Sequence, residues 1–370
     1  MSALTRFSLC PIGRLSSGPL NGTDDEDFDM SSLPFEIVPG VHIEDVSSRI
    51  RKGDFDCHKP GLGEYRIREL ERIKYAVIHR YPEHGRNPET GVALADPDHA
   101  QASHKLVQEI AACLRIIRPM TVRADFCEGK IAENGELYQI GFTEPDPDFS
   151  LPHNQRLFAL RNQDVQMLRS HVSTFRRALA EPFWKFRMAV QMYNTGYFQS
   201  NAGYIQTEWK IRFFLWSSAL EALFTTQNQN RQHSGSLVAK ERIKKMLGAN
   251  TSVYPPGELS SLGVNPNLTV SGVLDEIYCL RNHIAHGDKI PDYYYQTTGR
   301  IDVNGRLMRI DMLIENLSFI IRQCLLAIMK NGLLIHFQDA GSCEKYFNTL
   351  QLTKTAIQKR SPISKFSCPA

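Results

Sequence analysis

The sequence has no Cys-x-x-Cys pair, although its 370 residues include eight cysteines. A zinc ribbon or a dense disulfide framework is built on paired or regularly spaced cysteines, so their scattered placement argues against both classes of protein. The sequence favours reduced thiols that pack within the fold. The cysteines stand at positions 10, 57, 113, 127, 279, 324, 343 and 368.

Long apolar runs and a strong charge of one sign are also missing. No stretch of 18 residues is apolar throughout, and residues 1–15 lack the apolar segment of a signal peptide. We therefore expect a cytoplasmic protein with no membrane contact. The 43 basic and 40 acidic side chains leave a net charge of +3. Any affinity for nucleic acid must then come from local basic patches rather than from a global field.

The amino-terminal half predicts a disordered segment followed by a small domain of unknown role. Residues 1–33 are expected to be disordered because the acidic run at 24–27 repels itself. Residues 34–150 mix strand and helix patterns, which predicts a small α+β domain. The strand-like stretches are 35–38, 41–43, 75–79 and 137–142, and the helical pattern covers 104–117.

A cluster of two histidines and two arginines at residues 79–86 follows one of these strands. It can contact phosphates, or it can be a strand end that runs into a solvated turn, and the turn is the favoured interpretation. No acidic residue stands there at zinc-ligand spacing. We expect neither a metal nor a cofactor in this protein.

The carboxy-terminal half predicts a bundle of helices. A Pro- and Asp-rich stretch at 143–152 has linker composition, because Pro fixes φ and disfavours helix in the residue before it. Apolar residues then recur at helical spacing, which predicts an all-α domain over 155–338 and a basic tail over 339–370. The overall fold class is therefore α+β, with a mixed domain followed by a helical one.

Three features of this bundle each allow two interpretations. Glu221 lies among apolar and small residues in the strongest predicted helix, 205–224, so it either faces solvent or is a carboxylate that orients a cation. The tyrosines at 293–295 either stack on bases or pack over a helix. The helix predicted at 237–247 carries a basic run that either contacts an RNA backbone or is a solvated face. Its cations are Lys240, Arg242, Lys244 and Lys245.

The most concentrated polar chemistry lies at residues 280–288, directly after an apolar ladder at helical spacing. Arg281, Asn282, His283 and His286 fall within six residues, and Gly287 is a natural helix terminator. On one unbroken helix, Arg281 and His286 point about 140° apart at ~100° per residue. Either the helix opens before Gly287, or the two groups meet partners from a second copy of the chain. The second interpretation predicts a homodimer.

The Arg-to-His spacing alone is weak, because it occurs three times in this chain. The surrounding pattern is more specific. The phrase Ala-Leu-Glu-Ala-Leu-Phe at 219–224, a basic helix, then Arg281, Asn282 and His286 before a long closing helix resemble the HEPN superfamily, and within it the Apea-like group. The resemblance covers roughly residues 160–335, and the region before it resembles more loosely the mixed α/β part that precedes the HEPN domain in Apea-like defence proteins.

The resemblance implies a metal-independent endoribonuclease that acts as a dimer, often as a toxin or an antiviral effector of abortive infection. RNA would be the substrate, with transfer RNA as one candidate, and an antitoxin or a phage-derived trigger would be a further partner. Arg281, Asn282 and His286 would be catalytic, with His283 and Glu221 in support, and the products would be a 2′,3′-cyclic phosphate and a 5′-hydroxyl. The alternative is a HEPN domain without catalysis that binds nucleotide or RNA, or that serves only for dimerisation.

Overall fold

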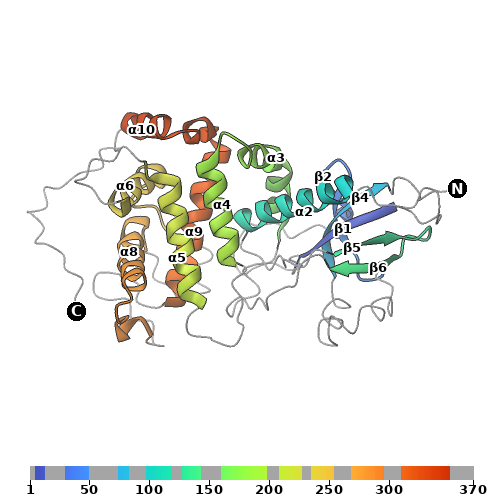
Figure 1. The fold of residues 1–370 in the computed structure, drawn as a ribbon, viewed down its shortest axis with the longest axis horizontal. Helices are drawn as coiled ribbons and strands as arrows, with labels where there is room; N and C mark the ends of the chain where they lie inside the picture. Colours follow the sequence, from blue (N-terminus) through green and yellow to red (C-terminus); the bar gives the residue numbers. More distant parts are fainter. Residues whose placement is uncertain are drawn as a thin grey trace, which may run out of the picture. The chain divides into compact units, whose positions relative to one another are not determined.

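The computed structural model describes ten stretches of the chain, which belong to two compact units (Figure 1). Unit 1 comprises Met1–Ser173 with Ser200–Ala202, and unit 2 comprises Thr174–Gln199 with Gly203–Ala370. The described residues are 5–12, 30–49, 74–82, 97–118, 127–142, 160–197, 208–226, 235–253, 268–295 and 310–350. No helix in these stretches is both long enough and apolar enough to cross a membrane.

Unit 1 contains a six-stranded antiparallel sheet in the order β2-β3-β4-β1-β5-β6. The predicted hairpin is confirmed, with Gly40 in its turn at a φ of 80° that favours glycine. Helix α2 packs on β1 and β4. The strands are β1 (Thr5–Ile12), β2 (Phe35–Val38), β3 (Val41–Asp45), β4 (Tyr75–Pro82), β5 (Cys127–Ile131) and β6 (Leu137–Phe142), and α2 spans Pro97–Ile117.

Strand β1 corrects the expectation that residues 1–33 are disordered. Residues 5–12 lie inside the sheet and pair with β4 on one side and with β5 on the other. Phe7, Ser8, Leu9 and Cys10 are all buried, so both faces of the strand are covered. A strand buried on both faces does not alternate between polar and apolar residues, and this one also contains a Ser and a Pro. The acidic run at 24–27 lies outside the described residues.

The polar cluster predicted at 79–86 begins with side chains that bind within unit 1. His79 Nδ1 lies 2.8 Å from Ser103 Oγ of α2, and that hydroxyl donates to Ser8 Oγ. Arg80 pairs with the buried Glu44 at 2.5 Å. Residues 83–86 lie outside the described stretches. In the part that is described, the cluster joins the sheet to α2, and this contact engages one of the two ring nitrogens of His79.

Helix α3 contains the division between the two units. The Arg118 Nε to Asp164 Oδ2 pair, at 3.6 Å, joins the end of α2 to the first turn of α3 within unit 1. The division between the two units falls after Ser173, whereas the linker composition predicted a boundary at 143–152. Residues 143–159 themselves lie outside the described part of the chain.

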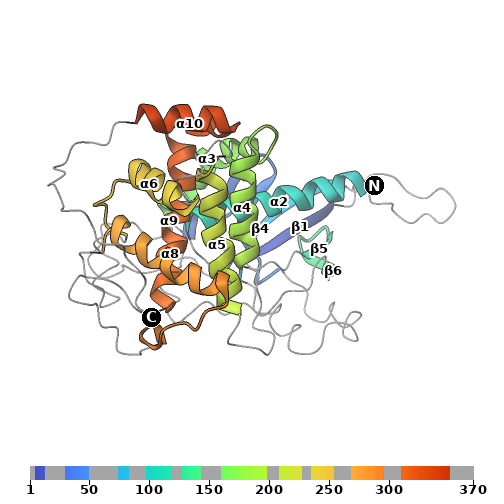
Figure 2. The ribbon, with the colours of Figure 1, turned by 60° about the vertical axis from the view of Figure 1, so that its left-hand side comes forward.

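Unit 2 is helical, and α5 lies at its centre. This helix packs against α4, α6, α8 and α9, as two views of the ribbon show (Figures 1 and 2). The helices predicted at 205–224 and 237–247 are observed, with others in the region predicted to be all-α. They are α3 (Asn162–Ala178), α4 (Trp184–Tyr197), α5 (Glu208–Phe224), α6 (Gly235–Leu247), α8 (Val270–His286) and α9 (Ile310–Lys330).

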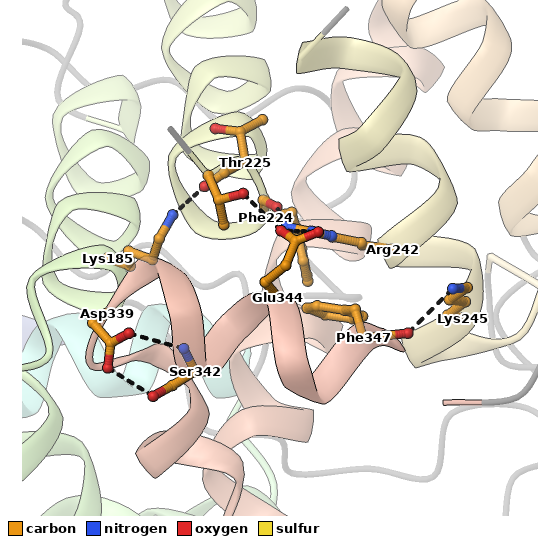
Figure 3. Close-up of polar contacts among 10 residues, drawn as sticks. Lys185, Phe224, Thr225, Arg242, Lys245, Asp339, Ser342, Glu344 and Phe347 are labelled. Atoms are coloured by element: carbon orange, nitrogen blue, oxygen red, sulfur yellow. Dashed lines mark hydrogen bonds and ion pairs between the residues drawn. The ribbon is translucent and has the colours of Figure 1, made fainter. Parts of the chain in front are cut away.

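The carboxy-terminal end of the described chain corrects the predicted tail over 339–370. After the short helix η4 (Leu333–Phe337), residues 340–349 form helix α10 (Ala340–Thr349), whose Phe347 is buried against Phe224 and Phe337. Asp339 caps α10 by accepting from Ser342 N at 2.8 Å (Figure 3). A tail of mixed composition thus supplies one more core element to unit 2. Residues 351–370 lie outside the described part.

Candidate active site on helix α8

Helix α8 runs without a break to His286. Thr269 caps its start, because its side-chain oxygen accepts from Gly272 N at 3.3 Å. Gly287 ends it in the left-handed region at a φ of 70°, and the next backbone N–H, of Asp288, donates to His283 O at 2.9 Å. The helix therefore does not open before Gly287. Within one chain, Arg281 and His286 point in different directions, about 140° apart around the axis.

Arg281 is held against helix α5. Its Nη2 donates to Glu221 Oε2 at 3.1 Å, and its guanidinium lies over the Phe214 ring at 5.6 Å. A second nitrogen, Nη1, donates to Asn282 Oδ1 at 3.4 Å. The side chains of Arg281 and Glu221 remain 21% and 22% exposed, so solvent reaches both. Of the two interpretations of Glu221, the structure has the carboxylate that orients a cation.

The electrostatics of this pair are set by partial burial. Burial raises the pKa of the Glu221 carboxyl, and the neighbouring Arg281 cation offsets part of that rise. Burial likewise raises the pKa of the Tyr278 phenol, and the negative charge of Glu221 adds to the rise. Both Tyr278 Oη and Arg281 Nε are buried, and neither has a hydrogen-bond partner among the residues that the structure describes. The pair thus lies at the edge of a region with few compensating polar contacts.

The remaining side chains of the motif lie in different surroundings. Asn282 and His286 are exposed, so both are open to a ligand or to a second chain. His283 is half-buried, with Nε2 4.0 Å from Cys279 Sγ and Nδ1 buried without a partner. The structure brings Arg281, Asn282 and Glu221 together in one chain, and it leaves His286 apart from them.

The basic run on α6 does not form one free face. Arg242 is buried, donates to Phe224 O at 2.6 Å and pairs with Glu344 at 2.5 Å (Figure 3). This corrects its candidacy as an RNA contact, because its donors are used inside the fold. The other cations have nearby partners: Lys240 pairs with Asp275 at 2.9 Å, Lys244 with Glu241 at 3.8 Å, and Lys245 donates to Phe347 O at 3.2 Å.

Sequence reasoning missed an exposed apolar face on α5. Ile211 and Phe214 are 47% and 38% exposed, and they share a face of the helix with Glu221 because these positions are three and seven residues apart. The signal was available in the sequence, since Ile211 and Phe214 are apolar but lie outside the buried stripe of Phe213, Trp216 and Leu220. Of the tyrosines at 293–295, Tyr294 is buried and donates to Glu276 at 3.3 Å, whereas Tyr295 is 53% exposed.

Other groups do not add to this site. Among the described residues, no three or more His, Cys, Asp or Glu side chains are grouped as metal ligands would be.

Comparison of the chain with models of known families, with curated proteins and with solved structures finds no match. The functional interpretation therefore depends on the geometry around Arg281 and on the sequence pattern that carries it.

Proposed function

We propose that this protein is a metal-independent endoribonuclease of the HEPN type that acts as a homodimeric toxin or antiviral effector. The observation that carries the proposal is the orientation of Arg281. A partly exposed guanidinium is fixed by Glu221 and by the face of Phe214, next to the exposed amide of Asn282. Such a fork is suited to binding the oxygens of an RNA phosphate in two places at once.

The unbroken α8 supports a site made by two chains. One chain cannot direct both Arg281 and His286 at one phosphate, since the helix continues to His286 and separates them around its axis. Pairing about a twofold axis can place Arg281 of one copy opposite His286 of the other. The exposed Phe214, which lies against Arg281, and the exposed Ile211, one turn before it on α5, supply apolar surface for that pairing. In this arrangement the dimer is a requirement of the chemistry.

The proposed reaction uses the nucleophile that RNA carries. A base accepts the proton of the 2′-hydroxyl, the O2′–P bond forms, and the P–O5′ bond breaks as the 5′ oxygen receives a proton. The products are a 2′,3′-cyclic phosphate and a 5′-hydroxyl. Histidine exchanges protons near neutral pH, which suits His286 to these transfers. Arg281 and Asn282 would stabilise the charge that develops on the phosphorus oxygens.

Substrate binding would draw on the α6 lysines that keep solvent contact. Lys240 and Lys244 are only partly buried, and their carboxylate partners, Asp275 and Glu241, are themselves about half exposed. Exposed ion pairs of this kind contribute little to stability, so an RNA backbone can compete for the lysines at small cost. Lys245 is the weaker candidate, because Phe347 O accepts one of its hydrogens.

A mixing experiment tests the proposal. Purified protein is incubated with total RNA and with bulk transfer RNA in excess EDTA, and RNA ends are sequenced. We expect wild type to cleave, and Arg281→Ala and His286→Ala to be inactive with their fold intact. A re-equilibrated equal mixture of the two variants should recover about a quarter of the activity, because half of the dimers then contain one intact composite site.

Lys289→Ala is the matched control, since Lys289 is a cation close to His286 whose side chain is 84% exposed. It should cleave like wild type. Absence of cleavage by wild type on both RNA samples contradicts the ribonuclease proposal. Cleavage by wild type without recovery in the mixture contradicts the composite site and leaves a site within one chain.

A dimerisation or RNA-binding module without catalysis is the second candidate. The observation that favours it is that Glu221 already neutralises Arg281, while Ile211 and Phe214 offer apolar surface for a second copy. This candidate predicts a stable dimer in sedimentation experiments, RNA binding that weakens with salt, and no new RNA ends. Ile211→Asp should then dissociate the dimer without any catalytic consequence.

A further inference from the structure

Within the described part of the chain, the hydroxyl of Tyr278 has no hydrogen-bond partner, although the residue is only 3% exposed. Tyr278 lies one turn before Arg281 on α8, so the two side chains share a face of the helix. A buried hydroxyl without a partner destabilises a fold, and phenylalanine would avoid that penalty at the same size. A native structure that keeps such a group raises the question of which state of the protein uses it.

The Glu221 carboxylate is a hydrogen-bond acceptor of the kind that the Tyr278 hydroxyl lacks. In the described part of the chain, the carboxylate forms one hydrogen bond, from Arg281 Nη2 to Oε2. Arg281 connects the two groups, because it lies one turn after Tyr278 on α8 and pairs with Glu221 at 3.1 Å. The raised pKa of Tyr278 keeps its proton in place, so the hydroxyl is available as a donor. A donor without an acceptor thus lies one turn from the arginine that holds a carboxylate with capacity to accept.

Binding of a phosphate, which rests on the proposed ribonuclease function, would change the balance in this cluster. In the resting chain, Glu221 is the anion that pairs with Arg281. A phosphate at Arg281 adds a second anion on the same guanidinium, which repels the half-buried carboxylate and competes with it. Without a second hydrogen-bond donor to its carboxylate, Glu221 would weaken the contact between Arg281 and the phosphate, although it is the residue that orients Arg281.

We propose that Tyr278 is a positioning residue whose hydroxyl donates to the Glu221 carboxylate when Arg281 binds an RNA phosphate. The bond keeps the carboxylate beside the guanidinium while the phosphate takes a larger share of the positive charge. Tyr278 touches no substrate in this arrangement and acts through Glu221. The resting protein accepts an unbonded hydroxyl because the RNA-bound state needs it.

Tyr278→Phe tests this role, with bulk transfer RNA in excess EDTA as the probe. We expect cleavage to fall about tenfold, mainly through a higher KM, since a hydrogen bond to a charged group is worth a factor of that order. The melting temperature should stay equal or rise, because the variant removes an unbonded buried hydroxyl. Tyr193→Phe is the matched control: Tyr193 is also buried, but its hydroxyl lies 2.9 Å from Ser318 Oγ. That variant should melt lower and cleave normally.

A double-mutant comparison separates action through Glu221 from a general packing effect. In a Glu221→Gln background, the neutral amide no longer competes with the phosphate, so Tyr278→Phe should change the KM by less than about twofold. A full additional loss in that background would overturn the proposal, as would normal cleavage by the single Tyr278→Phe variant. If wild type cleaves no RNA, the ribonuclease proposal fails and this one fails with it. Cleavage by wild type with an unaffected Tyr278→Phe variant removes the Tyr278 role alone.

Discussion

Replacing Arg242 by alanine should destabilise the protein strongly, although this residue looked like a surface cation in the sequence. Its guanidinium donates to Phe224 O at 2.6 Å, which satisfies a carbonyl at the end of α5 that has no helical partner. It also pairs with Glu344 at 2.5 Å and lies over the Phe347 ring at 5.2 Å (Figure 3). One side chain therefore joins α5, α6 and α10.

The expected loss in the free energy of unfolding follows from these three contacts. Loss of a charged donor to a buried carbonyl costs about 2 kcal/mol. The ion pair contributes at most about 1 kcal/mol, because the Glu344 side chain is 40% exposed and can be solvated once Arg242 is gone. Lost packing against Phe347 contributes of the order of 0.5 kcal/mol. Together these effects predict about 3 kcal/mol, or a melting temperature lower by roughly 10 °C for a domain of this size.

Urea unfolding of the intact protein measures this, with Lys240→Ala as the control on the same helix. Lys240 pairs with Asp275, whose side chain is 52% exposed, so its removal should change the free energy of unfolding by less than about 1 kcal/mol. A loss of less than about 1 kcal/mol in Arg242→Ala, or a loss equal to that of Lys240→Ala, would refute the reasoning. It would return Arg242 to the set of candidate RNA contacts.

Three further predictions concern titratable groups that differ in burial. Burial lowers the pKa of Lys185, whose amine donates to the backbone oxygens of Ala222 and Thr225. The unfolded chain then binds more protons, so wild type should gain stability relative to Lys185→Met as pH rises toward 10.5, measured by urea unfolding across that range. The pKa of Glu221 is raised, so wild type should lose stability relative to Glu221→Gln as pH rises from 4.5 through the raised pKa, and no change in the difference across that window would contradict the assignment. Cys279 is partly exposed, whereas Cys10, Cys113, Cys324 and Cys343 are buried, so mass spectrometry after brief alkylation should find Cys279 modified before Cys343.

The sequence was sufficient for the helical character of unit 2 and for the end of α8. Apolar spacing predicted an all-α region over the stretch that contains α3 to α9, and Gly287 ends α8 as the freedom of glycine in the left-handed region predicts. These features are local, because a helix is determined by residues three and four apart and by the first and last turns. The same locality made the angle between Arg281 and His286 calculable from their spacing alone. That angle left two alternatives for the site, a helix that opens or a second copy of the chain.

Tertiary structure decided the features that depend on partners far apart in the chain. β1 is a strand because β4 and β5 pair with it, although residues 5–12 contain Ser and Pro and do not alternate. Arg242 is buried because α10 brings Glu344 and Phe347 over it, 102 residues away for the ion pair. Glu221 lies beside Arg281 because α5 and α8 pack together, 60 residues apart. Whether a charged side chain is solvated or buried depends on which element covers it, and periodicity along one helix contains no information about its neighbours.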